Sequence, residues 1–379
     1  MKKATLIFAG DFCSCAPENI IISEELKIIL NKSDINILNI EGVFKSDDVC
    51  TANQTFLTQS EYVPQWCKDN NFKLVSMANN HSFDYGETGL KKTISAMDGC
   101  DIISVGVGNW TEAYSVKFLT INGLRIGFYA ATSADLASLK DKEFYNNQIG
   151  CAWINHPETR KNIHKAKKEC DYLFIMPHAG VEYMNIPLPE WRSIYKELID
   201  LGADAVLASH PHVPQGIEEY KGKPIYYSLG NFFFEGSGDI TKSKHKYWNT
   251  GLIAMITISD NGLTYKTYIT KRSFYNLGIE NDSSIIEHCN NITQILNDDK
   301  EYWNLLEKNI LHFHYKYKTW LLSGLNAQEM KFSTKKIISI LKSIFFRKPN
   351  YRLALHQIRE ESSLWTLQRA LKILSKTKL

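Results

Sequence analysis

Short apolar runs alternate with amphipathic segments along the chain up to about residue 270. Between several of the runs, apolar residues recur at helical spacing, as in Glu87–Met97, Glu158–Glu169 and Pro189–Leu201. This alternation of strand-length runs with helices is typical of an α/β fold with much parallel or mixed sheet. The apolar runs predict strands at Thr5–Gly10, Ile35–Ile40, Lys73–Ala78, Ile102–Val105, Arg125–Ala131, Tyr172–Met176, Ala205–Ala208 and Pro224–Ser228.

The pattern changes towards the C-terminus. Gly251–Ser259 and Leu263–Thr270 flank the turn Asp260-Asn261-Gly262, which predicts a β-hairpin. Beyond about residue 280 the periodicity is helical, and we divide the chain into an α/β domain, residues 1–275, and a helical basic region, residues 276–379. The helical segments are 284–297, 299–314, 334–346 and, with interruptions, 351–375.

Charge separates the two regions. Residues 331–379 hold 12 Lys and Arg against two acids, net +10, whereas the other 330 residues hold 32 basic and 39 acidic side chains, net −7. Cations interleaved with Ile, Leu and Phe favour a basic amphipathic helix, for which we expect peripheral contact with an anionic membrane. The alternative is an apolar face packed on the body with solvated cations. No motif supports a nucleic-acid partner.

Length and composition indicate how the chain is stabilised and in which compartment we expect it. A chain of 379 residues, 44% of them hydrophobic, can bury a stable core without added cross-links. The eight cysteines are scattered and predict reduced thiols of a cytosolic protein. The N-terminal apolar run is too short for a secretory signal, and no run of about 18 apolar residues exists. We expect a cytoplasmic protein, with peripheral contact at the inner membrane face through residues 331–379.

Polar residues follow six of the apolar runs directly. The carboxyl ends of strands in an open α/β sheet converge on one crevice, so these side chains can meet in space. Carboxylate, amide and imidazole ligands together suit Mn²⁺, Zn²⁺ or Fe²⁺. Any one of the residues alone has a plainer explanation as a turn or core residue, but their joint occurrence favours a metal site. They are Asp11, Glu41, Asn80, His81, Asp84, His178, Glu182, His210, His212 and Asn231.

Three sequence stretches that contain some of these residues resemble a known family. Asn79–Gly86, His210–Gln215 and Tyr227–Phe232 together resemble the bacterial CapA family, associated with capsule and poly-γ-glutamate synthesis, within the metallophosphoesterase superfamily. The resemblance covers roughly residues 4–235. It implies a calcineurin-like four-layer α/β/β/α sandwich, followed here by a helical C-terminal extension.

The resemblance also implies a site for one or two divalent ions. One ion would be bound by Asp11 and His212, and Glu41 would take the bridging position, where many metallophosphoesterases have Asp. The first motif of the superfamily is Asp-x-His, and Cys13 stands at the position of that His. Cys13 either replaces the imidazole or is a buried structural residue. The other ion would be bound by Asn80, His178 and His210.

The same resemblance implies that His81 would protonate the leaving group or steady the transition state. Asp84 follows three residues later and would either orient the His81 ring or stabilise the loop as a turn residue. Glu182 and Asn231 would face the substrate or hold the surrounding loop.

The resulting expectation is a metal-dependent hydrolase that acts on a small molecule or polymer carrying phosphate or carboxylate. Phosphoesterase-type chemistry in capsule, poly-γ-glutamate or surface-glycan synthesis is the first hypothesis. An amide-acting enzyme of polyglutamate metabolism is the second. A non-catalytic metal-binding scaffold of a polymer synthesis or export complex is the third.

Overall fold

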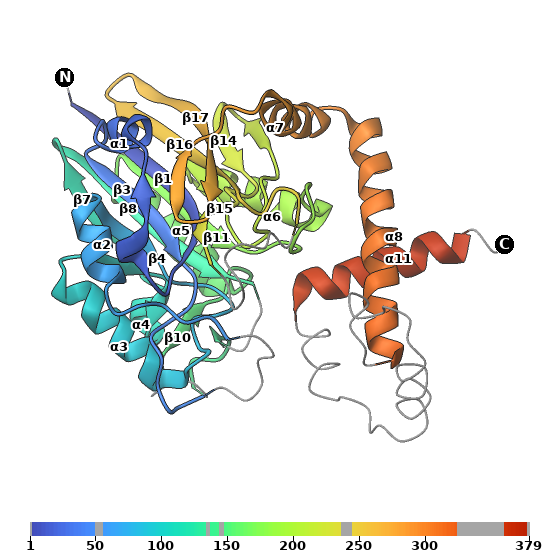
Figure 1. Ribbon diagram of the computed structural model, residues 1–379, viewed down its shortest axis with the longest axis horizontal. Helices are drawn as coiled ribbons and strands as arrows, with labels where there is room; N and C mark the ends of the chain where they lie inside the picture. The colour runs from blue at the N-terminus through green and yellow to red at the C-terminus, as the bar shows by residue number, and fades with distance from the viewer. Residues whose placement is uncertain are drawn as a thin grey trace. The chain divides into compact units, whose positions relative to one another are not determined.

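The computed structural model describes residues 2–49, 56–133, 137–143, 148–235, 245–323 and 360–376 (Figure 1). The chain divides into two compact units, Met1–Asn297 and Asp298–Leu379. The first unit therefore continues past residue 275, and the strands and helices described next all belong to it.

Strand β1 (Lys3–Cys13) lies inside a nine-stranded sheet. Eight of its strands follow the order β2-β18-β17-β16-β1-β3-β4-β5, and the ninth, β15, pairs with β1 outside this order. Its first part pairs antiparallel with β16, and its last residues pair in parallel with β15. This change of partner leaves the end of β1 between two parallel neighbours, β3 and β15. The other strands are β2 (Ile21–Ile22), β3 (Ile35–Ile40), β4 (Phe72–Ser76), β5 (Ile103–Val105), β15 (Asn231–Phe234), β16 (Thr250–Ser259), β17 (Gly262–Ser273) and β18 (Asn276–Ile279).

A second sheet has six strands in the order β13-β14-β12-β11-β8-β7, and a small third sheet has the order β6-β10-β9. Strands β8, β11, β12 and β14 run in parallel, whereas the edge strands β7 and β13 are antiparallel to their neighbours. The strands are β6 (Val107–Gly108), β7 (Lys117–Ile121), β8 (Leu124–Thr132), β9 (Ser138–Leu139), β10 (Gly150–Ala152), β11 (Tyr172–His178), β12 (Ala205–Leu207), β13 (Ile217–Tyr220) and β14 (Lys223–Tyr226).

The two large sheets pack face to face through aromatic side chains. The ring of Phe8 on β1 lies 5.2 Å from that of Phe174 on β11 and 6.4 Å from that of Phe128 on β8. All three residues are at most 1% exposed. The apolar core therefore fills the space between the sheets, as in other face-to-face sheet packings.

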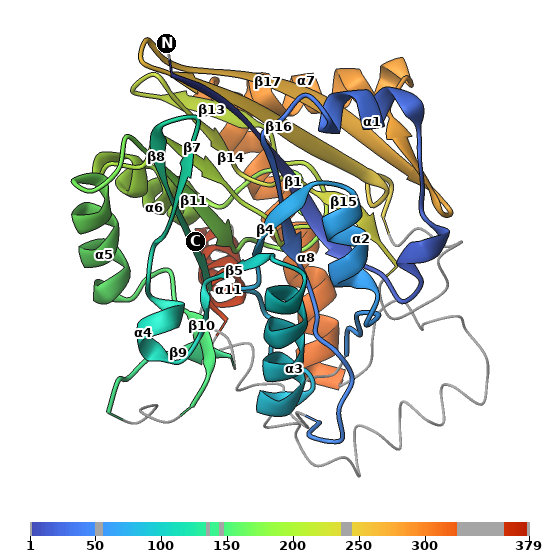
Figure 2. The same ribbon diagram turned by 90° about the vertical axis from the view of Figure 1, so that its left-hand side faces the viewer.

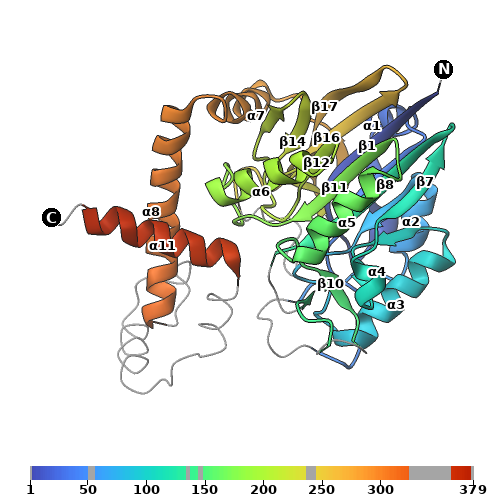
Figure 3. The ribbon, with the colours of Figure 1, turned by 180° about the vertical axis from the view of Figure 1, so that it is seen from behind.

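Helices cover the outer face of each sheet (Figures 2 and 3). Helices α2 (Val63–Asp69) and α3 (Gly86–Gly99) contact β4 and β5 of the first sheet, and α5 (Pro157–Lys167) and α6 (Pro189–Asp200) contact the second. The expected four-layer α/β/β/α arrangement is thus confirmed. The remaining helices of this unit are α1 (Glu24–Leu30), α4 (Trp110–Ala113) and α7 (Ser283–Ile295).

Each strand expected from an apolar run is present, and the hairpin around Asn261 is β16–β17. The strands missing from the sequence analysis are short or polar. An example is β13, whose sequence Ile-Glu-Glu-Tyr carries no apolar run. Such strands form because a neighbouring strand offers a ladder of hydrogen bonds, which leaves little trace in composition.

The second unit contains α8 (Asp299–Ser323), which is longer than expected, and α11 (Glu361–Lys376), which packs across α8. The helix expected at 334–346 lies outside the described residues. Among the helices that are described, none combines the length and the apolar character needed to span a bilayer. Membrane contact through residues 331–379 stays a prediction.

Replacing Phe8 by Ala should lower the free energy of unfolding by about 3–5 kcal/mol, because it empties a ring-sized space between the two sheets. Urea denaturation measures the change. Ile28→Ala on α1 is the control: this side chain is 57% exposed, so its removal should change stability by less than about 0.5 kcal/mol. Similar values for the two variants would contradict this account of the core.

Candidate metal centre

The polar residues expected at strand ends meet at one edge of the sandwich. Asp11 pairs in register with Asn39 on β3 and with Asn231 on β15. On the second sheet, His178 is the last residue of β11 and forms a bridge with Ser209, which follows β12. The ends of strands from both sheets therefore supply one cluster of side chains.

Tight backbone geometry places the end of β1 against the segment that leads into β15. The amide of Asp11 donates to Gly230 O at 2.9 Å. A Cβ atom on Gly10 would collide with that same carbonyl oxygen, so this close approach requires glycine. His210 and His212 have φ of 103° and 59°, which is uncommon for residues with side chains and is often found at functional sites.

Three atoms of the kind that bind metals surround His178 Nε2, which completes a group of four. His178 Nε2 lies 2.9 Å from Asn80 Oδ1, 3.2 Å from His210 Nδ1 and 3.7 Å from Glu41 Oε1. Atoms bound to one cation at about 2.0–2.2 Å stand about 3 Å apart, so this group has the spacing of a ligand shell. Glu41, His178 and His210 could hold a metal ion, and Asn80 adds an amide oxygen.

A second group lies next to the first. His212 Nε2 is 3.6 Å from Glu41 Oε1, and His212 Nδ1 is 3.5 Å from Asp11 Oδ2. Asp11, Glu41 and His212 could also hold an ion. Glu41 is the residue that the two groups share. Its role as a bridging ligand stays a prediction.

The Glu41 carboxylate provides the test of whether a cation fits. Its side chain is 0% exposed, and among the described residues neither oxygen has a hydrogen-bond partner. Burying an ionised carboxylate costs on the order of several kcal/mol. Hydrogen bonds, an opposite charge or a metal can compensate this cost. Carboxylate, imidazole and amide donors around this oxygen pair fit a divalent cation of the Mn²⁺, Zn²⁺ or Fe²⁺ type.

Burial keeps two of the imidazoles neutral. It lowers the pKa of His178 well below its ordinary value, and the neighbouring His210 and His212 act in the same direction. Burial also lowers the pKa of His210 to about 4, although the charge of Glu182 opposes this. Because only a neutral imidazole binds a metal, both rings are ready ligands at neutral pH.

The pair formed by Glu41 and His212 retains a proton. Burial raises the pKa of Glu41 well above its ordinary value, with the charge of His212 opposing. Burial opposes protonation of His212, but the charges of Glu41 and Asp11 raise its pKa to about 9. In the metal-free protein this proton partly offsets the two buried carboxylates, and a bound cation would replace it.

His81 and Asp84 form a separate pair beside the ligand groups. His81 Nδ1 lies 2.7 Å from Asp84 Oδ2, which also accepts from the amide of Leu57 at 2.7 Å. The other ring nitrogen, Nε2, is 3.9 Å from Glu41 Oε1, and the side chain of His81 is 13% exposed. Asp84 thus orients His81 with Nε2 towards the cluster, which is the geometry expected from the sequence.

Glu182 and Asn231 differ in their surroundings. Asn231 is 3% exposed; its Oδ1 lies 3.0 Å from His212 Nδ1, and its Nδ2 donates to Trp248 O at 2.9 Å. Asn231 therefore holds His212 so that Nε2 of that ring faces Glu41. Glu182 is half-buried, and its charge acts on Glu41, His210 and His212. Substrate contact by either residue stays a prediction.

Cys13 packs in a small apolar cluster with Leu57, Phe234 and Trp248. Its Sγ lies 3.8 Å from Thr58 O. Neither of the two ligand groups includes this cysteine, so its surroundings match the structural alternative. Its neighbours Phe234 and Trp248 also pack their rings 4.6 and 4.9 Å from that of His212.

Three supporting residues escaped the sequence analysis. Asn39 Nδ2 lies 2.8 Å from Asp11 Oδ1 and 3.2 Å from His178 Nδ1. Asn79 donates to Ile40 O at 2.7 Å and shapes the turn that carries Asn80. Gln59 Nε2 donates to both Phe12 O and Glu41 O at 2.9 Å. The signal for Asn39 was available, because a buried amide inside an apolar strand needs partners.

The four layers define a metallophosphoesterase-like fold, and the cluster at the strand ends could hold metal ions. Residues 6–236 match the family described as bacterial capsule synthesis protein PGA_cap. The chain belongs to this family, and the resemblance to CapA proteins is confirmed.

Relatives of known name agree with this assignment. The chain is 30% identical over 267 residues to the capsule biosynthesis protein CapA of Bacillus anthracis, covering 64% of this chain and 62% of that protein. It is 34% identical over 170 residues to the PGA biosynthesis protein CapA of Bacillus subtilis strain 168, covering 44% of each. The chain thus spans less than two thirds of the length of both relatives.

Among solved structures, a putative 5'-nucleotidase from Staphylococcus aureus aligns with a TM-score of 0.45 at 12% identity. The alignment covers 77% of this chain and 58% of that chain.

Glu41→Gln should reduce stabilisation by metal by more than half. At a Mn²⁺ concentration of 100 times its dissociation constant, the wild type should gain about 2.7 kcal/mol in unfolding free energy, and the variant should gain less than half of this. In EDTA the variant should be no less stable than the wild type, because it lacks the buried carboxylate. Urea denaturation with and without Mn²⁺ measures both effects. An undiminished Mn²⁺ response would exclude Glu41 as a ligand.

Proposed function

We propose that this protein is a metal-dependent hydrolase with phosphoesterase-type chemistry that serves the synthesis of a capsule, poly-γ-glutamate or another surface glycan. The single observation that carries the proposal is the Glu41 carboxylate, which is fully buried, has no hydrogen bond within the described residues and is shared by two ligand groups. The family supplies the biological setting.

The proposed ligands form the same two groups that the geometry defines. Divalent cations in such a site supply Lewis-acid activation of water and neutralise charge on a phosphoryl group. Asp11 and His212 would hold one ion, Asn80, His178 and His210 the other, and Glu41 both.

The protein's own residues would complete the reaction. His81 Nε2 faces the cluster while Asp84 occupies Nδ1. His81 can therefore move a proton at a single atom, Nε2, and in hydrolysis it would donate that proton to the leaving oxygen. Glu182 and Asn231 would face a substrate that carries phosphate or carboxylate, and the surrounding loops would limit access of bulk water.

Hydrolysis of bis-p-nitrophenyl phosphate with Mn²⁺ tests the activity. The wild type should release nitrophenol, and EDTA should stop the release. The double variant His178→Ala/His210→Ala should lose both the activity and the metal, measured by elemental analysis, because two of the ligands around Glu41 are gone. Full metal content in the double variant would contradict the site. Inactivity of the metal-loaded wild type on a panel of phosphoesters would contradict the hydrolase and favour the scaffold.

His81→Gln should lower kcat by about 10²–10⁴-fold, the range for loss of a general acid, with metal content unchanged. His164→Gln is the matched control, because His164 lies exposed on α5. Loss of metal from His81→Gln would show that His81 is a ligand, and an unchanged kcat would exclude its part in proton transfer.

A further inference from the structure

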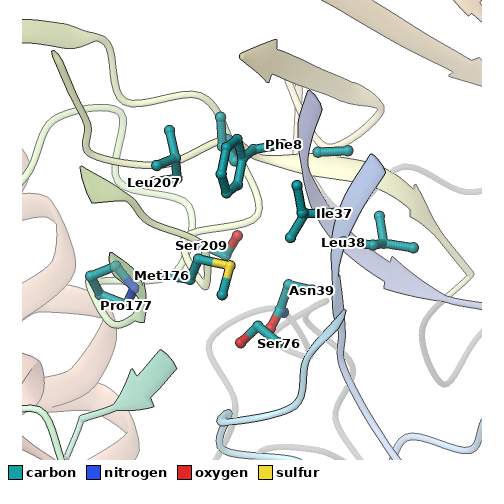
Figure 4. Close-up of a pocket in the computed structure, with 11 residues that line it drawn as sticks. Phe8, Ile37, Leu38, Asn39, Ser76, Met176, Pro177, Leu207 and Ser209 are labelled. Carbon is teal, nitrogen blue, oxygen red and sulfur yellow. The ribbon is translucent and has the colours of Figure 1, made fainter. Parts of the chain in front are cut away.

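A small cavity lies between the two sheets, next to the metal centre (Figure 4). It offers about 10 Å³ to the centre of a water molecule, which is the space that a single water needs. Most of its lining is apolar and comes from both sheets. Asn39 and Ser76 border it from the first sheet, and Ser209 borders it from the second.

Two polar atoms in this lining have no partner. Asn39 and Ser76 are 5% and 3% exposed, and within the described part of the chain neither Asn39 Oδ1 nor Ser76 Oγ makes a hydrogen bond. The two residues are partners in register on the parallel strands β3 and β4, so their side chains stand side by side. A buried amide oxygen and a buried hydroxyl left unpaired are each costly.

The orientation of the Asn39 amide is determined by its other atom. Asn39 Nδ2 lies 2.8 Å from Asp11 Oδ1, and an ionised carboxylate can only accept, so the nitrogen must face Asp11. The amide oxygen then points away from Asp11. One water can donate to this oxygen and accept the Ser76 hydroxyl proton, which satisfies both groups at once.

We propose that the cavity is the binding site of one internal water, which links Ser76 to Asn39 and so positions the ligands Asp11 and His178. Ser76 is then a positioning residue of the metal centre, although it touches no ligand directly. The effect on metal affinity rests on the proposed function, whereas the water itself does not. Loss of such an outer hydrogen bond to metal ligands lowers affinity by about 10–100-fold.

A crystal structure of the metal-free wild-type chain at high resolution tests the water. We expect an ordered water within hydrogen-bond distance of Asn39 Oδ1 and Ser76 Oγ. In Ser76→Ala this water should be absent or disordered, and the contact of Asn39 with Asp11 should loosen. A dry cavity in the wild type, or a direct hydrogen bond from Ser76 to Asn39, would overturn the proposal.

Titration with Mn²⁺ alone tests the positioning role. Ser76→Ala should weaken Mn²⁺ binding by about 10–100-fold. Ser104→Ala is the matched control: Ser104 Oγ is also buried and lacks a hydrogen bond among the described residues, but Ser104 lies on β5 and does not line the cavity. An equal loss of Mn²⁺ affinity in both serine variants would show that Ser76 acts only through packing, and would overturn its positioning role.

The pair Ser76→Thr and Ser76→Val isolates the hydroxyl, because the two side chains have nearly the same shape. Threonine should retain more of the Mn²⁺ affinity than valine, and equal affinities would count against the hydroxyl link. A wild type that binds no Mn²⁺ would remove the proposed function. The crystallographic water would then still decide this inference by itself.

Discussion

The buried carboxylate of Glu41 is the constraint around which the site is arranged. A charge removed from water demands compensation, and within the described residues neither carboxylate oxygen of Glu41 has a hydrogen-bond partner. His212 Nε2 lies 3.6 Å from Glu41 Oε1, and the proton that the Glu41–His212 pair retains in the metal-free state partly offsets the buried charge. The rest of the fold must therefore hold the His212 ring in place, because its movement away from Glu41 would leave the carboxylate charge in an apolar interior.

The sandwich supplies that rigidity. Asp11 and His178 lie near the ends of β1 and β11, and Glu41 directly follows β3. The bodies of these strands are packed in the core between the sheets, which restricts movement of their ends. The chain stores local strain at His210 and His212, whose φ angles are positive, and such strain persists only where the surroundings over-determine the conformation. Amides of Asn39, Asn79 and Gln59 then tie the loops to the strands through buried hydrogen bonds.

The groups that could hold metal ions and the His81–Asp84 pair are neighbouring but separate parts of the cluster. The carboxylate and imidazole candidates around Glu41 are buried, whereas Asn80 is half-buried. The side chain of His81 is 13% exposed and is oriented by Asp84. A site built in this way would let a substrate reach His81 without disturbing the ligands. The chain belongs to the family described as bacterial capsule synthesis protein PGA_cap.

Much of the fold and of the candidate site could be predicted from the sequence because the signals for them are local. Apolar runs bounded by polar residues marked the central strands, and Asp, Glu, Asn and His directly after them marked the crevice, since parallel strands end at a common edge. Tertiary structure alone decided the rest: the pairing of β1 with both β16 and β15, the partners of Asn39, the apolar surroundings of Cys13 and the cavity at Ser76. Each of these joins residues distant in the chain, and periodicity in a sequence carries no information about such contacts.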